Sequence, residues 1–399
     1  MRTHRFRIYP NKATEQKLQR TLDICRFTYN QLLDEFSSWD NISKYELQSR
    51  IVDYQICYPE LKEVYSKTLQ YENYRLFSNL RALGEIKKKG RKVGRLRFKG
   101  SGWFKTIHYN QSGYKLIITG KRCQILKLSK IGQIPIRCHR IFNGIIKQVV
   151  VKREPSGKWF ASLITDEQKQ VPKKIIKKVI GIDLGLTDSV WDSDNNKIEN
   201  PKFLKKYSEQ LAKCQRSMSK KKLGSNNREQ FRIRLAKRYE KLTNTRKDFI
   251  HKLTRYYADN YDVIGMEDMV ISNMVKGKKN RYSKSLLDAC FGLIRSEMQR
   301  KAENAGGVFI PVNYRGTTSR CSQCGNNVKK DIWEREHICY ECGFVAPRDY
   351  NSALEIKRLA IEEIRQELPE STLGEMEALH CKVQLPSMSQ EAPTSTSQC

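Results

Sequence analysis

Long hydrophobic runs are missing from this chain. Within its 399 residues no apolar stretch approaches the ~18 residues that would span a bilayer. The N-terminal MRTHRFRIYP also lacks the apolar core of a signal peptide. Regularly spaced cysteines are scarce, because eight of the twelve are scattered through a large basic chain. Scattered cysteines are typical of free thiols in a reducing cytosol. We therefore expect a protein with no membrane partner and no structural disulfides.

Acidic residues are in deficit. The 43 aspartates and glutamates are outnumbered by 75 lysines and arginines, which gives a formal net charge of +32. Such an excess favours a polyanionic partner, and at this chain length nucleic acid is the leading candidate. The alternative is a basic protein whose charges are simply solvated. The length itself allows two or three domains with a substantial core.

Four cysteines do have regular spacing. They form two C-x-x-C pairs, Cys321/Cys324 and Cys339/Cys342, with fourteen residues between the pairs and a glycine after each pair. Glycine lets the backbone turn tightly around the sulfurs. Four thiolates arranged as two knuckles suit tetrahedral zinc, whereas incidental free thiols are the alternative. With every ligand position filled by cysteine, no position remains for a catalytic water, so the pattern predicts a structural zinc ribbon.

The first 165 residues combine strand and helix patterns. Residues 5–9 alternate polar and apolar side chains and predict a strand, and a helix is expected to begin near Thr14. Helical patterning continues over 43–86. Residues 87–99 carry eight bases and two glycines, which indicates either a loop that moulds to phosphates or a solvated linker. Residues 105–165 are rich in β-branched and aromatic residues and predict a small barrel or sandwich that the first strand joins.

Two carboxylates stand at the ends of buried strands. Asp183 ends the apolar run 179–182, and Glu267 ends the run 261–266. A carboxylate in such a place is costly unless it is paired or holds a cation. A strand, a turn and a second strand around an early aspartate are typical of RNase H-like nucleases, although a G-x-D-x-G strand is also common in sugar-kinase-like ATPases. A third acid, Asp349, opens a helix just after the cysteines, where an N-cap is the usual role.

The order of these three acids favours a metal site. Asp183, Glu267 and Asp349 each lie at the end of an element, in the order found in RNase H-like folds. Three converging carboxylates bind Mg²⁺ or Mn²⁺ through hard oxygen ligands. Two such ions ~3.5–4 Å apart can activate a water and stabilise the leaving oxygen in phosphodiester hydrolysis. The three acids therefore predict a metal-dependent nuclease.

Helices and one more strand fill the remaining sequence. Residues 202–260 are basic and helical with a break at 223–227, which predicts a helical hairpin whose charged face either contacts a phosphate backbone or is solvated. A single helix is expected over 285–304, followed by a strand over 307–312.

Several motifs, taken in order, resemble the TnpB proteins encoded by insertion sequences. They are RFTYNQLL and RFK in the first third, then GIDLG, IGMED, TTSRCSQCG with CYECG, and RDYNSA. The resemblance covers nearly the whole chain to about residue 365. It implies an RNA-guided DNA endonuclease, with a guide RNA made from the transposon end and a short recognised motif beside a double-stranded DNA target. It also implies that Asp183, Glu267 and Asp349 form a RuvC triad. Two positions depart from the usual pattern, Pro347 and Ser352.

The same resemblance implies an α/β multidomain fold. It would combine an RNase H-like (RuvC) nuclease, interrupted by the zinc ribbon, with an N-terminal wedge β-barrel that carries an inserted helical recognition domain. The expected bounds are 1–10 and 95–170 for the wedge barrel, 11–94 for the recognition domain, 175–315 and 346–366 for the nuclease, 316–345 for the ribbon, and 367–399 for a disordered tail.

A monomer with one guide RNA is expected. It would work in the cytoplasm with the nucleoid of a prokaryote, or in the nucleus of a eukaryotic host. No second nuclease motif is visible, so one pocket would cut both strands in turn. Two other functions stay open: a transposase that uses the same acids for strand transfer, and an RNA-guided regulator that binds without cutting. The presence of all three acids favours cutting over the regulator.

Overall fold

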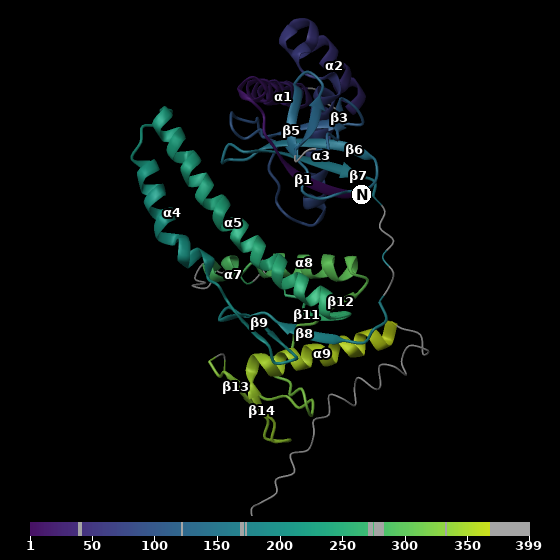
Figure 1. Ribbon diagram of the computed structural model, residues 1–399, viewed down its shortest axis with the longest axis vertical. Helices are drawn as coiled ribbons and strands as arrows, with labels where there is room; N and C mark the ends of the chain where they lie inside the picture. The colour runs from purple at the N-terminus through teal and green to yellow at the C-terminus, as the bar shows by residue number, and fades with distance from the viewer. Residues whose placement is uncertain are drawn as a thin grey trace, which may run out of the picture. The chain divides into compact units, whose positions relative to one another are not determined.

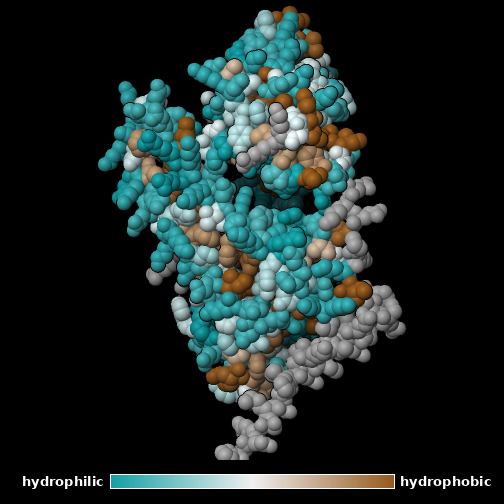
Figure 2. Space-filling model, viewed as in Figure 1, coloured by the Kyte–Doolittle hydropathy of each residue, from teal (hydrophilic) through white to brown (hydrophobic). Residues whose placement is uncertain are grey.

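The chain divides into two compact units. The computed structural model describes residues 1–38, 42–120, 123–167, 171, 174–269, 274, 283–331 and 333–367 (Figure 1), so the expected tail over 367–399 lies almost wholly outside the described residues. The first unit is Met1–Lys169 with Gly224–Lys237, and the second is Gln170–Leu223 with Arg238–Cys399. Among the described helices, none is long and apolar enough to cross a membrane. Hydrophilic residues dominate the face seen in Figure 2, as the composition requires.

A seven-stranded sheet forms the core of the first unit, in the order β2-β6-β7-β1-β5-β4-β3 with every neighbouring pair antiparallel. The predicted N-terminal strand is confirmed, because β1 lies between β7 and β5 with His4, Phe6 and Ile8 buried. The strands are β1 (Arg2–Ile8), β2 (Thr106–Asn110), β3 (Tyr114–Ile117), β4 (Gln124–Leu128), β5 (Gly132–Arg137), β6 (Ile146–Arg153) and β7 (Trp159–Thr165).

Side chains draw the two ends of this sheet together. The hydroxyl of Tyr109 on β2 donates to the carbonyl of Ser129 beyond β4 at 3.0 Å. Tyr114 on β3 donates to the carbonyl of Ile146 on β6 at 2.7 Å. Among the described residues β2 and β3 are the two edge strands and do not pair with each other. Closure into a wedge barrel therefore stays a prediction.

Three α-helices and a short 3₁₀ helix share the hydrophobic core of this sheet: α1 (Lys12–Ser38), α2 (Lys44–Cys57), η1 (Pro59–Glu63) and α3 (Ser66–Lys88). The first begins earlier than predicted, because the Asn11 side chain accepts a 2.9 Å hydrogen bond from the Thr14 amide. Ser43 and Glu46 form a reciprocal capping box at the start of α2. The helical patterning predicted over 43–86 is confirmed as α2, η1 and α3.

Glu72 on α3 is fully buried in this core. Its Oε2 lies 3.3 Å from Nε of Arg75, and neither carboxylate oxygen accepts a hydrogen bond. Burial raises the pKa of Glu72 to about 8, and Arg75 opposes the shift. A glutamate carboxyl in an unfolded chain has a pKa of about 4.3. Folding therefore favours the protonated form of Glu72. The contribution of this carboxyl to the free energy of unfolding is fully present below its pKa in the unfolded chain, and it is lost as the pH rises through its pKa in the folded protein.

Replacing Glu72 with glutamine should remove this pH dependence. Between pH 5 and pH 9, the stability of the wild-type unit is expected to fall relative to that of Glu72→Gln, with a gap of roughly 2–5 kcal/mol at the alkaline end. Thermal and urea unfolding of both proteins across that range would measure the gap. Parallel curves for the two proteins would show that Glu72 does not titrate in this window.

The second unit is built on a five-stranded mixed sheet in the order β10-β9-β8-β11-β12. Strands β8, β11 and β12 are parallel, whereas β9 and β10 are antiparallel to their neighbours. The bounds are β8 (Val179–Asp183), β9 (Asp188–Asp192), β10 (Lys197–Glu199), β11 (Val263–Glu267) and β12 (Val308–Val312). This meander after β8 confirms the predicted strand, turn and strand, and Asn195 adopts a φ of 62° in the second turn.

Helices cover both faces of this sheet (Figure 1). On one face α9 (Arg348–Glu367) packs Ile356, Ala360 and Ile364 against β8, β11 and β12. On the other face lie the C-terminal part of α5 (Asn226–Asn260) and α8 (Phe291–Asn304), in a core that includes Tyr257 and Met298. The predicted helical hairpin is confirmed as α4 (Phe203–Ser219) followed by α5, and Arg238 of α5 donates to Gln210 of α4 at 2.6 Å.

The single helix predicted over 285–304 is wrong. The structure has α7 (Ser283–Ala289) and then α8, which starts at Phe291. Cys290 between them adopts the left-handed conformation with a φ of 56°, which interrupts the helical hydrogen bonds. The apolar spacing runs on across this break because Leu286 and Ile294 are buried in the same core. Periodicity alone therefore reads the two helices as one.

Candidate functional site

The three predicted carboxylates come from elements that meet at one end of the second sheet. Asp183 is the last residue of β8, and Glu267 is the last residue of β11. Because β8 and β11 are adjacent and parallel, their carboxyl ends share one edge of the sheet. Asp349 is the second residue of α9, so it lies inside the helix rather than at the N-cap position.

All three acids line a single cavity of about 1010 Å³ within the second unit. The cavity is also lined by basic side chains that would attract an anionic substrate: Lys202, Lys205, Lys284, Arg335 and Arg348. A fourth acid, Asp288, lines it too, but Asp288 is paired with Arg246 and accepts the amide of Leu204 at 2.9 Å. The cavity therefore combines an acidic centre with basic walls.

Burial dominates the electrostatics of the centre, and the crowding of negative charge adds to it at Asp183. Burial raises the pKa of Asp183 well above its ordinary value, and the nearby Glu267 and Asp349 raise it further, while Arg348 opposes the shift. Burial also raises the pKa of Glu267, against a 2.5 Å hydrogen bond from the Thr317 hydroxyl. Arg348 Nε donates to Asp349 at 3.2 Å. An acid whose pKa is raised by burial and by two neighbouring carboxylates is one that a bound cation would stabilise in its charged form.

The donor set fits a hard divalent cation. Carboxylate oxygens are the ligands that Mg²⁺ and Mn²⁺ prefer. Among the described residues, the cysteine cluster is the group of potential ligands whose atoms all lie within 4.8 Å of one another, and the three carboxylates are not grouped so tightly. Acids that share two ions need not crowd around one point. The fit to such an ion therefore rests on the chemistry of the donors, which are all carboxylate oxygens.

Glycines in β8 and β11 explain how α9 comes so close. A Cβ at Gly181 would lie 2.1 Å from the carbonyl oxygen of Ala353 and 2.4 Å from the amide of Lys357. A Cβ at Gly265 would lie 2.8 Å from Cβ of Ala360. Only glycine permits this approach of helix to strand, which sets the position of the helix that carries Asp349.

Replacing Gly181 with alanine is therefore expected to push α9 away from the sheet. The backbone atoms of α9 cannot move aside locally, so the second unit should lose about 1–3 kcal/mol of stability. Thermal unfolding would measure the loss. Gly84→Ala is the matched control, because a Cβ there meets nothing within 4 Å. Equal stability of the two variants would contradict the packing argument.

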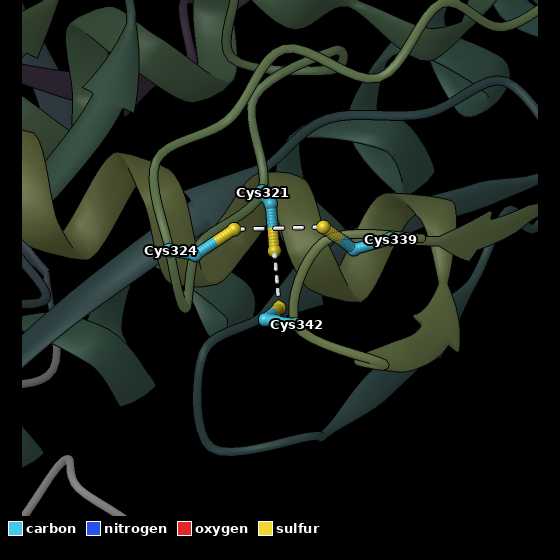
Figure 3. Close-up of side chains that lie close together, drawn as sticks. All are labelled: Cys321, Cys324, Cys339 and Cys342. Atoms are coloured by element: carbon cyan, nitrogen blue, oxygen red, sulfur yellow. Dashed lines mark hydrogen bonds between the residues drawn. The ribbon is translucent and has the colours of Figure 1, made fainter.

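The four predicted zinc ligands converge as well (Figure 3). In each knuckle the amide of the glycine after the second cysteine donates to the carbonyl of the first cysteine at 2.9 Å. The Sγ atoms of Cys321 and Cys342 are 3.7 Å apart, and those of Cys324 and Cys339 are 3.5 Å apart. A tetrahedral zinc with Zn–S bonds of about 2.3 Å places its sulfurs about 3.8 Å apart, so the cluster fits the ion. Amide donation from Cys342 lowers the pKa of Cys339 to about 7, whereas burial raises the pKa values of Cys321 and Cys342.

The ribbon is tied directly to the acidic centre. Asn351 of α9 is fully buried, accepts the Ser322 amide at 3.0 Å and donates to the Arg320 carbonyl at 2.9 Å. Thr317, just before the first knuckle, holds Glu267. Strands β13 (Glu336–Ile338) and β14 (Val345–Pro347) then lead into α9. Sequence reasoning assigned no role to Thr317 or Asn351, and their place inside the recognised motifs was the available signal.

The two departures from the family pattern are accommodated. Pro347 is the last residue of β14. Ser352 is buried, and its hydroxyl donates to the carbonyl of Arg348 at 3.1 Å. A serine that bonds four residues back is compatible with a helix interior.

Comparison with known proteins supplies a family. Residues 162–278 match the OrfB_IS605 model, described as "Probable transposase". Residues 291–356 match the TNB domain of the Cas12f1-like family, and residues 1–39 match an OrfB_IS605 helix-turn-helix domain. The matched segments together cover more than half of the chain. The chain belongs to the TnpB family. In this TnpB-family chain the described part of the helix-turn-helix match consists of β1 and α1.

Full-length relatives agree with this membership. The TnpB-family chain is 28% identical to a "Putative RNA-guided DNA endonuclease" of Streptomyces pristinaespiralis, over 89% of this chain and 88% of the relative. It is 26% identical to "Putative RNA-guided DNA endonuclease InsQ" of Escherichia coli K12, over 89% and 91%. A Cas12f1–sgRNA–target DNA complex superposes with a TM-score of 0.55 at 15% identity, covering 88% of this chain and 83% of that one. That likeness shows a shared multidomain fold.

Proposed function

We propose that this TnpB-family chain is an RNA-guided, magnesium-dependent DNA endonuclease. The observation that carries the proposal is the presence of Asp183, Glu267 and Asp349 in one basic-walled cavity, contributed by three separate motifs. Relatives named as RNA-guided DNA endonucleases, matched over most of their length, support the guided form of the activity. The net charge of +32 supports two nucleic-acid partners, a guide RNA and a double-stranded DNA target.

The nuclease part is assigned to the RNase H-like (RuvC) class. Support comes from the meander β8-β9-β10, the parallel additions β11 and β12, and acids at the ends of β8 and β11. The nuclease would occupy the bounds expected from the sequence, and the first sheet would close into a wedge barrel. The protein would act as a monomer with one RNA, beside the nucleoid of a prokaryote or in a nucleus.

Each residue of the centre has a distinct role in this proposal. Asp183, Glu267 and Asp349 would hold Mg²⁺, or Mn²⁺, through their oxygens. Such ions supply Lewis acidity for phosphodiester hydrolysis when bound. Thr317 orients Glu267 by donating to one of its oxygens, which leaves the other oxygen available as a ligand. Arg348 contacts Asp349 and adds positive charge beside the reacting phosphate. The basic walls position the backbone of the strand to be cut.

Target choice would be divided between RNA and protein. Pairing with the guide reads the sequence, while protein contacts read a short motif beside the target. The strand that leaves the duplex and its partner would be cut in turn in the same cavity. The structure carries this single cavity with the three acids among its described residues.

A transposase is the second candidate. The description "Probable transposase" for residues 162–278 favours it, as does a relative named "Putative transposase R186" from a mimivirus, 29% identical over 36% of this chain. The same three acids could serve hydrolysis or strand transfer. The two functions differ in their need for RNA and in their products.

Copurified RNA separates the two candidates. The protein is purified from cells that carry its native flanking DNA, the bound RNA is sequenced, and a matching duplex is offered with Mg²⁺. The proposal expects a discrete RNA from the element's end and cleavage that depends on it. Cutting or joining of DNA without RNA would favour the transposase. RNA-dependent binding without cleavage would favour the regulator.

A further inference from the structure

One large aromatic side chain at the nuclease cavity has no role in the proposed chemistry. Trp333 lies on the ribbon between its two knuckles, and its side chain is 78% exposed. It lines the same cavity as Asp183, Glu267 and Asp349. Tryptophan is highly buried on average, so an indole in solvent at the mouth of a site is a candidate contact for a ligand.

The backbone beside Trp333 is fixed relative to Asp349. The carbonyl of Arg335 accepts the Arg348 amide at 2.8 Å, and the carbonyl of Glu334 accepts from the Arg348 guanidinium at 3.1 Å. The two residues that follow Trp333 are thus bonded to the residue that precedes Asp349. The backbone next to the indole is therefore held at a set place with respect to the acidic centre.

The charges around the indole select a nucleic-acid occupant. Lys202, Lys205 and Arg335 line the cavity with Trp333, so an anionic backbone finds cations next to an aromatic face. Basic grooves with an exposed ring are the arrangement that binds single-stranded nucleic acid, because every base offers a face to stack on. Bases inside a duplex are already stacked and cannot use such a platform.

We propose that Trp333 stacks on an unpaired base of the DNA strand in the nuclease cavity and so places the scissile phosphate against the three acids. This inference rests on the proposed function and names its immediate substrate as single-stranded DNA. Trp333 is a positioning residue, since the reacting atoms are handled by the carboxylates. The platform would also favour strands already released from the duplex.

Binding of bare oligomers tests the proposal without any cleavage. The full-length zinc-loaded protein is titrated, without magnesium, with a single-stranded thymidylate of about 15 nucleotides and with an abasic chain of the same length. Trp333→Ala is expected to weaken binding of the thymidylate on the order of tenfold and to leave the abasic chain unchanged. Trp333→Phe should retain most of the affinity for the thymidylate.

Tyr340→Ala is the matched control. Tyr340 is an aromatic residue of the same ribbon, is 89% exposed and does not line the cavity. The Tyr340→Ala protein should bind both oligomers with the affinity of the wild type. All variants should contain the same amount of zinc as the wild type. Two results with Trp333→Ala would overturn the stacking role: equal weakening of the binding of both oligomers, or no weakening for either. Failure of Trp333→Phe to retain affinity for the thymidylate would also overturn it. A uridylate RNA oligomer of the same length is titrated as well. If Trp333→Ala weakens binding of the uridylate alone, the occupant is RNA and the proposed stacking on DNA is wrong.

This test and the test of the proposed function fail separately. A protein that never cuts guided DNA could still show the base-dependent contribution of Trp333. Conversely, a guided nuclease in which Trp333→Ala binds thymidylate normally would contradict only the stacking role.

Discussion

Asp183→Asn is expected to lower RNA-guided DNA cleavage on the order of a thousandfold or more, because a bound metal contributes several kcal/mol of transition-state stabilisation. Burial raises the pKa of Asp183, and both Glu267 and Asp349 raise it further. Asparagine keeps the shape and removes the charge that would hold the cation. The measurement is the single-turnover cleavage rate of a matched duplex with saturating guide RNA.

Binding measurements separate this effect from misfolding. The variant should bind guide RNA and target DNA as the wild type does. In magnesium-free buffer it should unfold at the same temperature or higher, since removal of one of three crowded charges relieves repulsion. Asp268→Asn is the matched control, because Asp268 follows Glu267, pairs with Arg295 and does not line the cavity. Retained cleavage in Asp183→Asn would place the reaction in another pocket.

Short-range patterns predicted most of the fold. Alternation in residues 5–9 predicted a strand, and β1 does carry Phe6 and Ile8 into the core of the first sheet. The sequence pattern did not predict the structure where a residue adopts a backbone conformation that is unusual for its type. Cys290 adopts a left-handed φ, which is usual for glycine and rare for cysteine. The sequence therefore predicts α7 and α8 as one helix. The start of α1 was also misplaced, since Asn11 rather than Thr14 caps it.

The candidate site was predictable where burying a single unpaired charge would cost free energy. An acid at the end of a buried strand demands a partner, which drew attention to Asp183 and Glu267 without any structure. Asp349 needed the other two, because a helix-opening aspartate is usually a cap. Thr317 and Asn351 were not predicted to have roles, since their partners Glu267 and Ser322 are brought near only by the tertiary fold. A threonine in a turn and an asparagine in the first turn of a helix look solvated until the fold is known.

Cys321→Ser is expected to release zinc and to lower cleavage by about a hundredfold or more, although Cys321 itself does not line the catalytic cavity. Structural zinc contributes directly to the folding of its domain, so loss of one of four thiolates should unfold the ribbon. The knuckle that contains Cys321 also supplies both partners of Asn351, the Ser322 amide and the Arg320 carbonyl. Without them the first turn of α9 loses its anchor.

A displaced α9 would move Asp349 away from Asp183 and Glu267, and a shift of about 1 Å can cost about a hundredfold in rate. Zinc content by atomic absorption and the cleavage rate measure the two halves of the prediction. Cys57→Ser, an exposed thiol on α2 in the first unit, is the control and should change neither. Asn351→Ala completes the argument, because it cuts the link while all four thiolates remain. That variant should keep its zinc and still lose most of the activity, and full activity in it would show that the ribbon acts by another route.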